Sequence, residues 1–330
     1  MDKKIIVTGA MGFIGSNLLA KLEHLGYTNI IAIDNFGKET KWKNVAKRTS
    51  IEFKPIEDLF QYVTANASNI QAIIHLGAVS STVETDVDLI IATNYTLTIS
   101  LYRFCKIKSI QFIYSSSAAT YGNGNKGFND VQDFDSLRKF QPLNAYGWSK
   151  HQTDLYISRN GGFENSKNQT VALKFFNVYG PNEYHKGSQS SVIYTFYNQL
   201  NSIGKIKLFR SFDSRIQDGE QKRDFVFVED CVDIIIWFLT HPSISGIYNV
   251  GSGQSNTFNY LAQLVSKNCK LSCKIEYIPF PNELLHKYQN YTCADIHKLR
   301  EAGYQKEMTP LSTGIREYIM SYLTKQDKYI

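Results

Sequence analysis

A tyrosine and a lysine stand four residues apart in the segment YGWSK, from Tyr146 to Lys150. On a helix this spacing places both side chains on one face, one turn apart. A nearby cation favours the phenolate of a tyrosine and brings its pKa toward neutrality, where the side chain can serve as an acid and a base. Tyr102 and Lys106 have the same spacing, so the surrounding sequence must distinguish the two pairs.

Ser117 favours the pair at 146 and 150. It closes the serine triplet at 115–117, which ends an apolar segment typical of a buried strand, and ligands of α/β proteins bind at the carboxyl ends of such strands. A serine that binds the reacting oxygen, a tyrosine that exchanges its proton and a lysine that binds the nicotinamide ribose form a set for hydride transfer. We therefore expect Ser117, Tyr146 and Lys150 to be catalytic and the other pair to lie on the surface.

A glycine-rich turn, VTGAMGFIG at 7–15, follows the first apolar segment and contains Gly9, Gly12 and Gly15. Glycines at these positions permit a tight turn, close approach of the backbone to a pyrophosphate and close packing of a helix on the sheet. The free amides of the helix N-terminus favour the same anion. Asp34 follows Gly9 by 25 residues, where an acid that binds a ribose is expected. These residues indicate a dinucleotide cofactor.

The segment 38–54 carries six basic and two acidic side chains, a local charge of +4. An acid such as Asp34 favours the free ribose hydroxyl of NAD, whereas the 2′-phosphate of NADP needs cations. Lysines beside Asp34 and Asn35, with Lys41 and Lys54 as candidates, could supply them. We therefore expect NADP, with NAD as the alternative, and interpret most other basic residues of this segment as a solvated loop.

Short segments rich in Ile and Val alternate with segments of helical period. The expected strands span 4–7, 30–34, 51–53, 72–76, 111–115 and 170–176, and the expected helices span 17–25, 87–105 and 144–158. This alternation predicts the α/β class, with a Rossmann-type doubly wound parallel sheet and a smaller α/β substrate-binding domain. We assign residues 1–176 and about 224–257 to the dinucleotide-binding domain, to which a strand at 224–228 and a helix at 231–239 return. Residues at about 177–223 and 258–330 are assigned to the substrate-binding domain.

Composition excludes several classes of protein. Hydrophobic residues make up 43% of the 330 and charged residues 20%, which excludes a disordered chain. The longest apolar run, 234–239, is far shorter than the roughly 18 residues of a membrane helix. The net charge of +6 is modest, and the basic residues are not interleaved with a motif on which bases could stack. Both observations argue against a protein that binds nucleic acid. Five cysteines with one close pair, Cys269 and Cys273, indicate thiols in a reducing cytoplasm and no metal site.

The glycine turn together with Ser117, Tyr146 and Lys150 resembles the extended short-chain dehydrogenase/reductases that act on sugar nucleotides. Five longer blocks resemble, more narrowly, the family of ADP-L-glycero-D-manno-heptose 6-epimerases. These blocks occur in order over nearly the whole chain and are SSAATYG at 116–122, FNVYGP at 176–181, HKGS at 185–188, KRDFV at 222–226 and IEYIPFP at 275–281.

The resemblance implies an isomerase that supplies heptose for the lipopolysaccharide core. Such an enzyme oxidises the C6 hydroxyl of ADP-D-glycero-D-manno-heptose with tightly held NADP, lets the ketone rotate, and returns the hydride to the other face. Inversion of an exocyclic carbon in this way needs an acid/base on each side of the carbonyl. The two family residues correspond to Tyr146 and Lys186. The resemblance also implies a homo-oligomer.

Binding roles follow from the same resemblance. On the cofactor side it adds Phe13, Ile14, Leu76, Gly77, Ala78, Val79, Ser80 and Asn94. On the substrate side it implies Asn177, Val178 and Ser188 near the sugar together with Ser117, then Phe209 and Arg223 near the ADP, and Tyr288. Arg223 has a clear physical role, because a guanidinium can pair with a diphosphate through two hydrogen bonds.

Another sugar-nucleotide reaction on the same scaffold is the main alternative. A UDP-hexose 4-epimerase would share the serine, tyrosine and lysine but would not require the block at 185–188. A 4,6-dehydratase needs an Asp-Glu pair near the serine, where this chain has Ala118-Ala119-Thr120, and is therefore disfavoured. A dinucleotide-sensing module without catalysis would be expected to lack the tyrosine or the lysine, and this chain has both.

Overall fold

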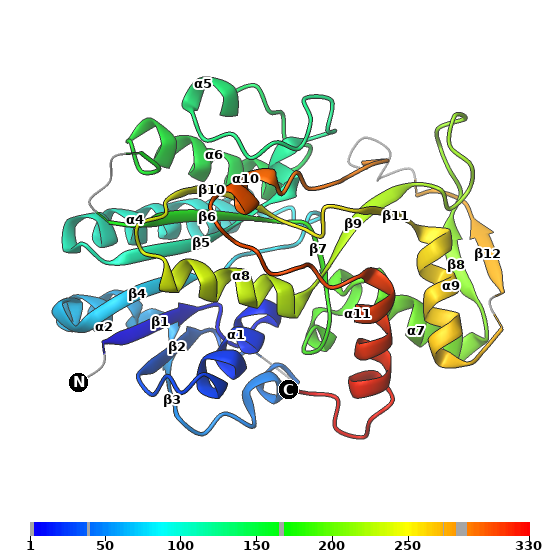
Figure 1. The fold of residues 1–330 in the computed structure, drawn as a ribbon, viewed down its shortest axis with the longest axis horizontal. Helices are drawn as coiled ribbons and strands as arrows, with labels where there is room; N and C mark the ends of the chain where they lie inside the picture. The colour runs from blue at the N-terminus through cyan, green and yellow to red at the C-terminus, as the bar shows by residue number, and fades with distance from the viewer. Residues whose placement is uncertain (1–2, 38–39, 165–167, 273, 282–288) are drawn as a thin grey trace.

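The computed structural model describes residues 3–37, 40–164, 168–272, 274–281 and 289–330. Seven parallel strands form its large sheet, in the order β10-β6-β5-β4-β1-β2-β3 (Figure 1). These strands are β1 (Lys4–Thr8), β2 (Ile30–Asp34), β3 (Ile51–Pro55), β4 (Ile70–His75), β5 (Gln111–Ser117), β6 (Thr170–Phe175) and β10 (Gly246–Val250). The strand order reverses between β1 and β4, and such a reversal opens a crevice at the carboxyl ends of the strands.

Helices cover both faces of the large sheet. One face packs against α1 and α8 through residues such as Leu18, Ile74 and Ile235. The other packs against α2, α4 and α6 through residues such as Val63 and Ile73. The adjacent Ile73 and Ile74 enter opposite cores because side chains alternate along a strand, so both faces demand apolar residues. The bounds are α1 (Phe13–His24), α2 (Leu59–Ala65), α4 (Leu97–Lys108), α6 (Ala145–Arg159) and α8 (Val228–Thr240).

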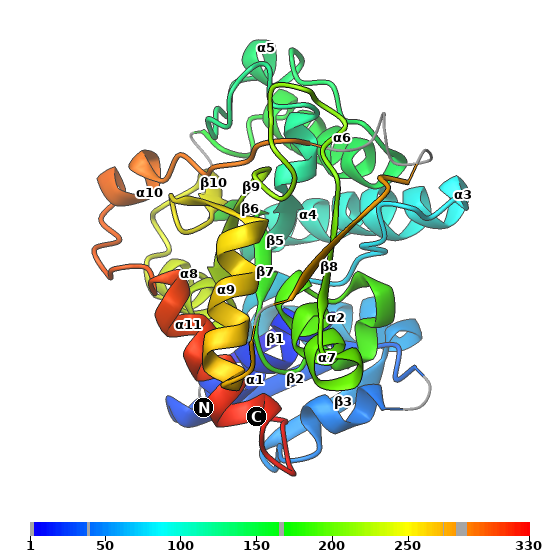
Figure 2. The same ribbon diagram turned by 90° about the vertical axis from the view of Figure 1, so that its right-hand side faces the viewer.

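A smaller lobe lies on the right of Figure 1 and faces the viewer in Figure 2. Its core includes Phe196, Leu261 and Ile315, from α7 (Val192–Ile203), α9 (Phe258–Cys269) and α11 (Leu311–Glu317). One small sheet joins β7 (Asn177–Tyr179), β9 (Lys222–Phe227) and β11 (Ser255–Thr257), and a second joins β8 (Ile206–Phe209) to β12 (Ile275–Ile278).

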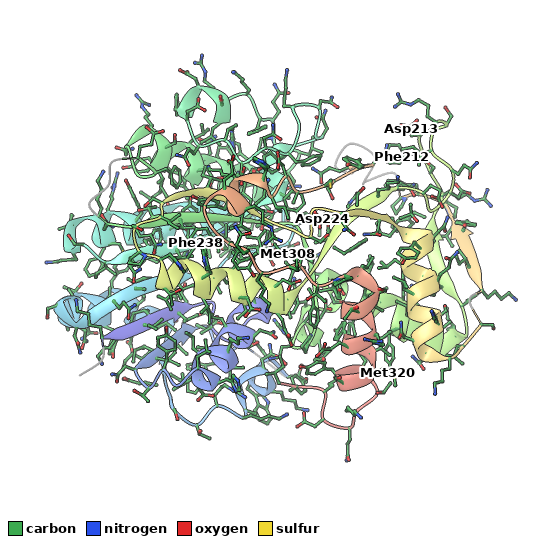
Figure 3. The ribbon with its side chains drawn as sticks, in the orientation of Figure 1. Phe212, Asp213, Asp224, Phe238, Met308 and Met320 are labelled. Carbon is green, nitrogen blue, oxygen red and sulfur yellow. The ribbon has the colours of Figure 1, made fainter. Side chains whose placement is uncertain are left out.

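Asp224 on β9 joins the two lobes, and Figure 3 labels it at their junction. Its carboxylate accepts hydrogen bonds from the backbone amides of Ser252, Gly253 and Ala294, at 2.7, 3.0 and 2.9 Å. A buried carboxylate is stable when such donors surround it. These bonds therefore hold β9 to the segment that follows β10 and to the segment that contains Ala294.

Short elements complete the described chain. They are the helices α3 (Val87–Ile90), α5 (Phe134–Leu137) and α10 (His297–Glu301), and the 3-10 or π turns η1 (Lys41–Val45), η2 (Ile56–Asp58), η3 (Ala67–Asn69), η4 (Ile91–Thr96), η5 (Ala118–Tyr121), η6 (Tyr184–Gln189) and η8 (Tyr318–Leu323). Among the residues that the structure describes, no helix is both long and apolar enough to cross a membrane.

The α/β class and the Rossmann-type sheet are confirmed, and each of the six expected strands forms. The strand expected at 224–228 forms as β9, which lies between β7 and β11 in a small sheet, and β10 supplies the seventh strand of the large sheet. The division into two domains stays a prediction. Leu299 and Tyr304, from the segment assigned to the second domain, pack in the core with α1 and α8.

Candidate active site

A cavity of about 730 Å³ lies at the carboxyl ends of β1, β4 and β5 and reaches η6 and α9 of the smaller lobe. Its size is that of a site for a cofactor or another small molecule. The predicted residues that line it are Gly9, Gly12, Phe13, Ile14, Gly15, Asp34, Lys41, Leu76, Gly77, Ala78, Val79, Ser80, Ser117, Tyr146, Asn177, Val178 and Lys186.

The glycine turn is most crowded where it meets the segment after β4 and less crowded at Gly12, which lines the cavity. Gly9 has φ +65°, and a Cβ on it would lie 2.4 Å from the backbone nitrogen of Gly77. A Cβ on Gly15 would lie 2.2 Å from the carbonyl oxygen of Gly9. On Gly12, which precedes α1, the nearest atom would be 3.1 Å away. The first and third glycines therefore serve packing, and the second leaves the helix N-terminus accessible to an anion.

Asp34 ends β2 and is already engaged through both carboxylate oxygens. Oδ2 accepts a hydrogen bond of 2.8 Å from the Met11 amide, and Oδ1 lies 2.9 Å from Nζ of Lys41. The same ammonium donates a 2.7 Å bond to the carbonyl of Asn35. Lys41 is thus held at the mouth of the predicted ribose site, where it offsets the charge of Asp34.

Asn94 lies in the π turn η4 and is fully buried. Its side chain exchanges two hydrogen bonds with the backbone of Val79, at 2.8 and 2.9 Å, and donates a third to Ser149 on α6 at 3.1 Å. Asn94 does not line the cavity. It holds the segment after β4 and the helix that carries Tyr146 in a fixed relationship, so its role is positioning.

Ser117 ends β5, Tyr146 lies in the first turn of α6, and both residues line the cavity. Burial raises the pKa of Tyr146, and a hydrogen bond with Ser117 acts in the opposite direction. The expectation that a lysine brings this pKa toward neutrality is therefore wrong for the chain by itself. The reason is that desolvation of the phenolate outweighs the stabilising contacts.

Lys150 is buried, and its ammonium donates to the carbonyl and the hydroxyl of Ser115 at 2.8 and 3.2 Å. Burial lowers its pKa to about 8, while Asp154 acts in the opposite direction. The residue does not line the cavity. Lys150 contacts the end of β5 behind Ser117. It lies one helical turn from Tyr146 on α6, as the spacing in the sequence predicts.

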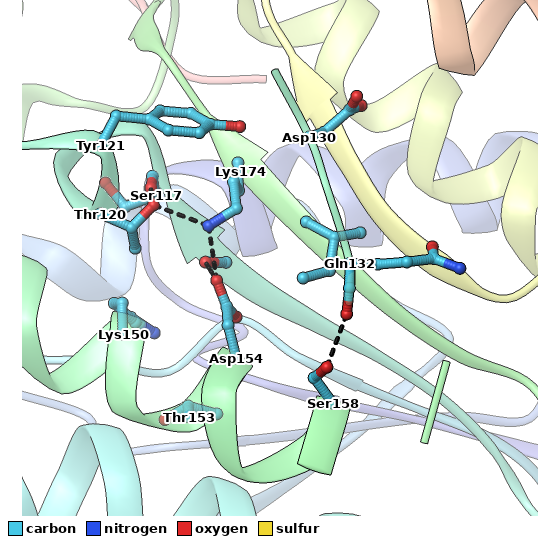
Figure 4. A network of polar contacts seen from close by, with 12 residues as sticks. Ser117, Thr120, Tyr121, Asp130, Gln132, Lys150, Thr153, Asp154, Ser158 and Lys174 are labelled. Atoms are coloured by element: carbon cyan, nitrogen blue, oxygen red, sulfur yellow. Dashed lines mark hydrogen bonds and ion pairs between the residues drawn. The ribbon is translucent and has the colours of Figure 1, made fainter. Parts of the chain in front are cut away.

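A buried ion pair lies behind this set of residues (Figure 4). Nζ of Lys174 is 2.6 Å from Oδ2 of Asp154, and both side chains are fully buried. The ammonium also donates to Oγ1 of Thr120 at 2.7 Å, and that hydroxyl donates to the carbonyl of Ser117 at 2.8 Å. The pair therefore connects α6, β6 and the end of β5 beneath the cavity.

Lys186 enters the cavity from η6, 5.6 Å from the centre of the Phe13 ring. Burial lowers its pKa, and Glu183 acts in the opposite direction. Glu183 also fixes the loop, because its buried carboxylate accepts a 2.7 Å bond from the Ser191 hydroxyl and bonds the Ser191 amide. A lysine of lowered pKa reaches its neutral, basic form more readily than a solvated one.

Several predicted residues do not line the cavity. The ammonium of Lys54 lies 2.8 Å from Glu52 and over the ring of Tyr62. Lys54 pairs in register with Ile33, whose side chain packs in the core on the side of α2. The side chain of Lys54 therefore points to that side of the sheet. The prediction for Lys54 is therefore wrong. Asn35, Ser188, Phe209 and Arg223 also lie outside the lining, although Arg223 is buried against Phe258, which does line it. Tyr288 lies outside the described residues.

Phe209 belongs to an aromatic cluster of the smaller lobe. Phe209 packs against Phe280, with ring centres 5.5 Å apart, and Phe212 lies 4.8 Å from the same ring. Figure 3 labels Phe212 near the tip of the smaller lobe. Tyr102 of the second tyrosine–lysine pair is buried rather than on the surface.

The lining also includes residues that the sequence analysis missed. His185 accompanies Lys186 on η6, and burial lowers its pKa to about 4. Phe225 and Phe258 supply an aromatic wall from the smaller lobe. His185 is part of the block at 185–188 and Phe225 is part of the block at 222–226, so both could have been found there. Phe258 stands in none of the blocks.

Residues 5–251 match the NAD dependent epimerase/dehydratase family. The chain is 42% identical to an ADP-L-glycero-D-manno-heptose-6-epimerase of Fusobacterium nucleatum, over 99% of this chain and 100% of that protein. It is 40% identical to the protein of that name from Nitratidesulfovibrio vulgaris, over 98% of this chain and 99% of the other.

Solved structures show the same architecture. The ADP-L-glycero-D-manno-heptose-6-epimerase of Helicobacter pylori superposes with a TM-score of 0.79 at 27% identity, over 96% of this chain and 95% of that one. A UDP-N-acetylglucosamine 4-epimerase of Methanobrevibacter ruminantium has the same TM-score of 0.79 at 24% identity, over 96% and 97% of the two chains. The second likeness shows the fold alone.

Proposed function

The chain belongs to the NAD dependent epimerase/dehydratase family and, within it, to the ADP-L-glycero-D-manno-heptose-6-epimerases, and we propose that it inverts C6 of ADP-D-glycero-D-manno-heptose with bound NADP. It is an enzyme of the isomerase class. The observation that carries the mechanism is that Tyr146 and Lys186 enter one cavity from different lobes. Two proton carriers on separate elements can serve two faces of one carbonyl.

The residues at the head of the cavity fit a dinucleotide. Gly9 and Gly15 allow no side chain, Gly12 leaves the start of α1 accessible, and Asp34 stands at the end of the next strand. A nicotinamide cofactor held by these residues would supply reversible hydride transfer at C6 of the sugar. Lys41, already beside Asp34, is the cation that we assign to the 2′-phosphate of NADP.

The chain itself moves the protons. As C6 loses its hydride, the O6–H bond breaks and the proton passes to one of the two residues, leaving a ketone. After the ketone rotates, the other residue protonates the oxygen as the hydride returns to the opposite face. Burial raises the pKa of Tyr146 and lowers that of Lys186, so both shifts favour the uncharged side chains. One residue acts as the base and the other as the acid, and the two roles are exchanged for the other epimer. Ser117 binds the same oxygen.

Two substitutions test this assignment. Tyr146→Phe and Lys186→Met should each abolish net epimerisation, a loss on the order of 100-fold to 10,000-fold, because one face of the carbonyl loses its proton carrier. Circular dichroism should show an intact fold. Tyr102→Phe and Lys106→Met are matched controls, since that pair has the same spacing on α4 and should leave the rate unchanged. A fully active Lys186→Met enzyme would disprove the two-base mechanism.

The substrate needs a separate experiment. The purified chain is incubated in turn with ADP-D-glycero-D-manno-heptose, UDP-galactose and GDP-mannose, and the products are separated by chromatography. We expect conversion of the ADP-heptose alone. Conversion of UDP-galactose alone would favour a UDP-hexose 4-epimerase and leave the fold and the cofactor site unaffected. The homo-oligomer and the reducing cytoplasm stay predictions.

A further inference from the structure

Residues 325–330, here called the tail strap, leave the last turn of the smaller lobe and return to the first domain. In Figure 1 this red segment ends beside blue elements of the first domain. Nζ of Lys47, just after η1, lies 2.8 Å from the carboxylate of Asp327 and donates a 2.6 Å bond to the carbonyl of Tyr329. One end of the strap is therefore fastened to the segment that carries Lys41.

The strap also contacts the loop that carries Lys186. The hydroxyl of Tyr184 donates a 2.7 Å bond to the carbonyl of Lys328, and the ammonium of Lys328 lies 4.4 Å from the centre of the Tyr184 ring. The ring of Tyr329 meets the same ring edge to face at 5.2 Å. Finally, the amide of Ile330 donates a 3.2 Å bond to the side chain of Asn182.

The loop that receives these contacts is a short and irregular element. It is a 3-10 turn of six residues, interrupted at Gly187, whose φ is 53°. Short 3-10 turns have poor hydrogen-bond geometry and owe their stability to tertiary contacts. Glu183 closes the loop from the inside, His185 contacts Asn44 at 3.0 Å, and the ring of Tyr184 packs against Tyr194 and Tyr318. The strap adds one edge-to-face and one cation–π contact to the same Tyr184 ring.

We propose that the tail strap is a positioning element for Lys186, holding η6 against the first domain so that the lysine faces the same carbonyl as Tyr146. The proposal rests on the two-base function argued above. An acid/base that is displaced by about 1 Å loses on the order of 100-fold in rate, so a loop of this kind needs an external support. The strap meets that need and at the same time contacts the segment of Lys41 on the cofactor side.

The two-base mechanism offers a readout that a merely structural role would not change. Each epimer presents its O6–H to a different residue, so Lys186 serves only one of them as the initial base. The full chain with NADP is mixed rapidly with either epimer, and the first-turnover rate of nicotinamide reduction is recorded. The variants are Lys328→Ala with Tyr329→Ala, a chain that lacks residues 326–330, and Lys186→Met. Lys325→Ala is the matched control, since Lys325 is an exposed lysine of the same strap.

We expect both strap variants to slow oxidation of the epimer that Lys186→Met slows, by about tenfold or more, and to oxidise the other epimer at the rate of the unmodified chain. The control variant, Lys325→Ala, should oxidise both epimers at that rate. The strap proposal is overturned when Lys186→Met slows one epimer but the strap variants slow neither, or both alike. If Lys186→Met itself slows neither epimer, the two-base function fails, and the strap proposal fails with it.

Discussion

Lys41 and Asp34 form an ion pair of 2.9 Å at the end of β2, while the second oxygen of Asp34 is bonded to the Met11 amide. We expect Lys41→Met to weaken NADP binding by about 1.5 to 3 kcal/mol, the range for a hydrogen bond to a charged group, and to affect NAD much less. Lys43→Met, an exposed lysine of the same turn, is the control. The measurement is a calorimetric titration with both cofactors. NAD binding at least as tight as NADP to the unmodified chain would contradict the NADP assignment.

Gly9 and Gly26 both have positive φ, but only Gly9 is crowded. An added Cβ at Gly26 meets nothing within 4 Å, whereas at Gly9 it would lie 2.4 Å from the Gly77 backbone. Gly26→Ala should therefore cost about 1 to 2 kcal/mol of unfolding free energy, the strain of the left-handed region alone. Gly9→Ala should cost more and abolish cofactor binding. Urea unfolding with a cofactor titration distinguishes them, and equal losses would show that crowding at the turn is unimportant.

The ion pair of Lys174 and Asp154 is completely buried, unlike that of Lys21 and Asp233, whose lysine is 37% exposed. Lys174→Met leaves an unpaired carboxylate in the core and should lower the unfolding free energy by about 3 to 5 kcal/mol. Lys21→Met should cost no more than about 1 kcal/mol. Chemical denaturation of the two variants provides the comparison. A loss at Lys174 as small as that at Lys21 would mean that water or a rearranged neighbour compensates Asp154.

His75 lies in the core with Nδ1 2.6 Å from the Thr8 hydroxyl and Nε2 3.0 Å from that of Thr98. Burial, followed by the charge of Lys150, lowers its pKa from 6.5 to about 3. Between these values the unfolded chain binds the extra proton, so this contribution to stability is complete above pH 6.5 and is lost as the pH falls toward 3. His75→Gln should lower the slope of the unfolding free energy against pH by about 1.4 kcal/mol per pH unit in this range. The measurement is the unfolding free energy of both chains as a function of pH. The same slope for both chains between these pH values would refute the prediction.

Most strands that are buried on both faces could be predicted from the sequence, because each is a short run of apolar residues. β10 could not. Its five residues, Gly246–Val250, include a glycine and an asparagine, yet all five are buried. Asn249 is tolerated because its amide donates to the carbonyls of Phe128 and Asp295 at 2.6 and 2.9 Å, partners that are distant in the sequence. Long-range hydrogen bonds make a polar residue acceptable in a core, and no local pattern predicts them.

The site divides in the same way. The sequence by itself determined the spacing of Tyr146 and Lys150 and the glycines of the turn, because helix geometry and backbone sterics act over a few residues. Only the tertiary structure decided that Lys186 enters the same cavity from the other lobe, that Lys41 pairs with Asp34 while Lys54 faces away, and that the tail strap returns to η6. It also decided the direction in which the pKa of Tyr146 shifts, because the desolvation that raises it depends on how the surrounding elements pack.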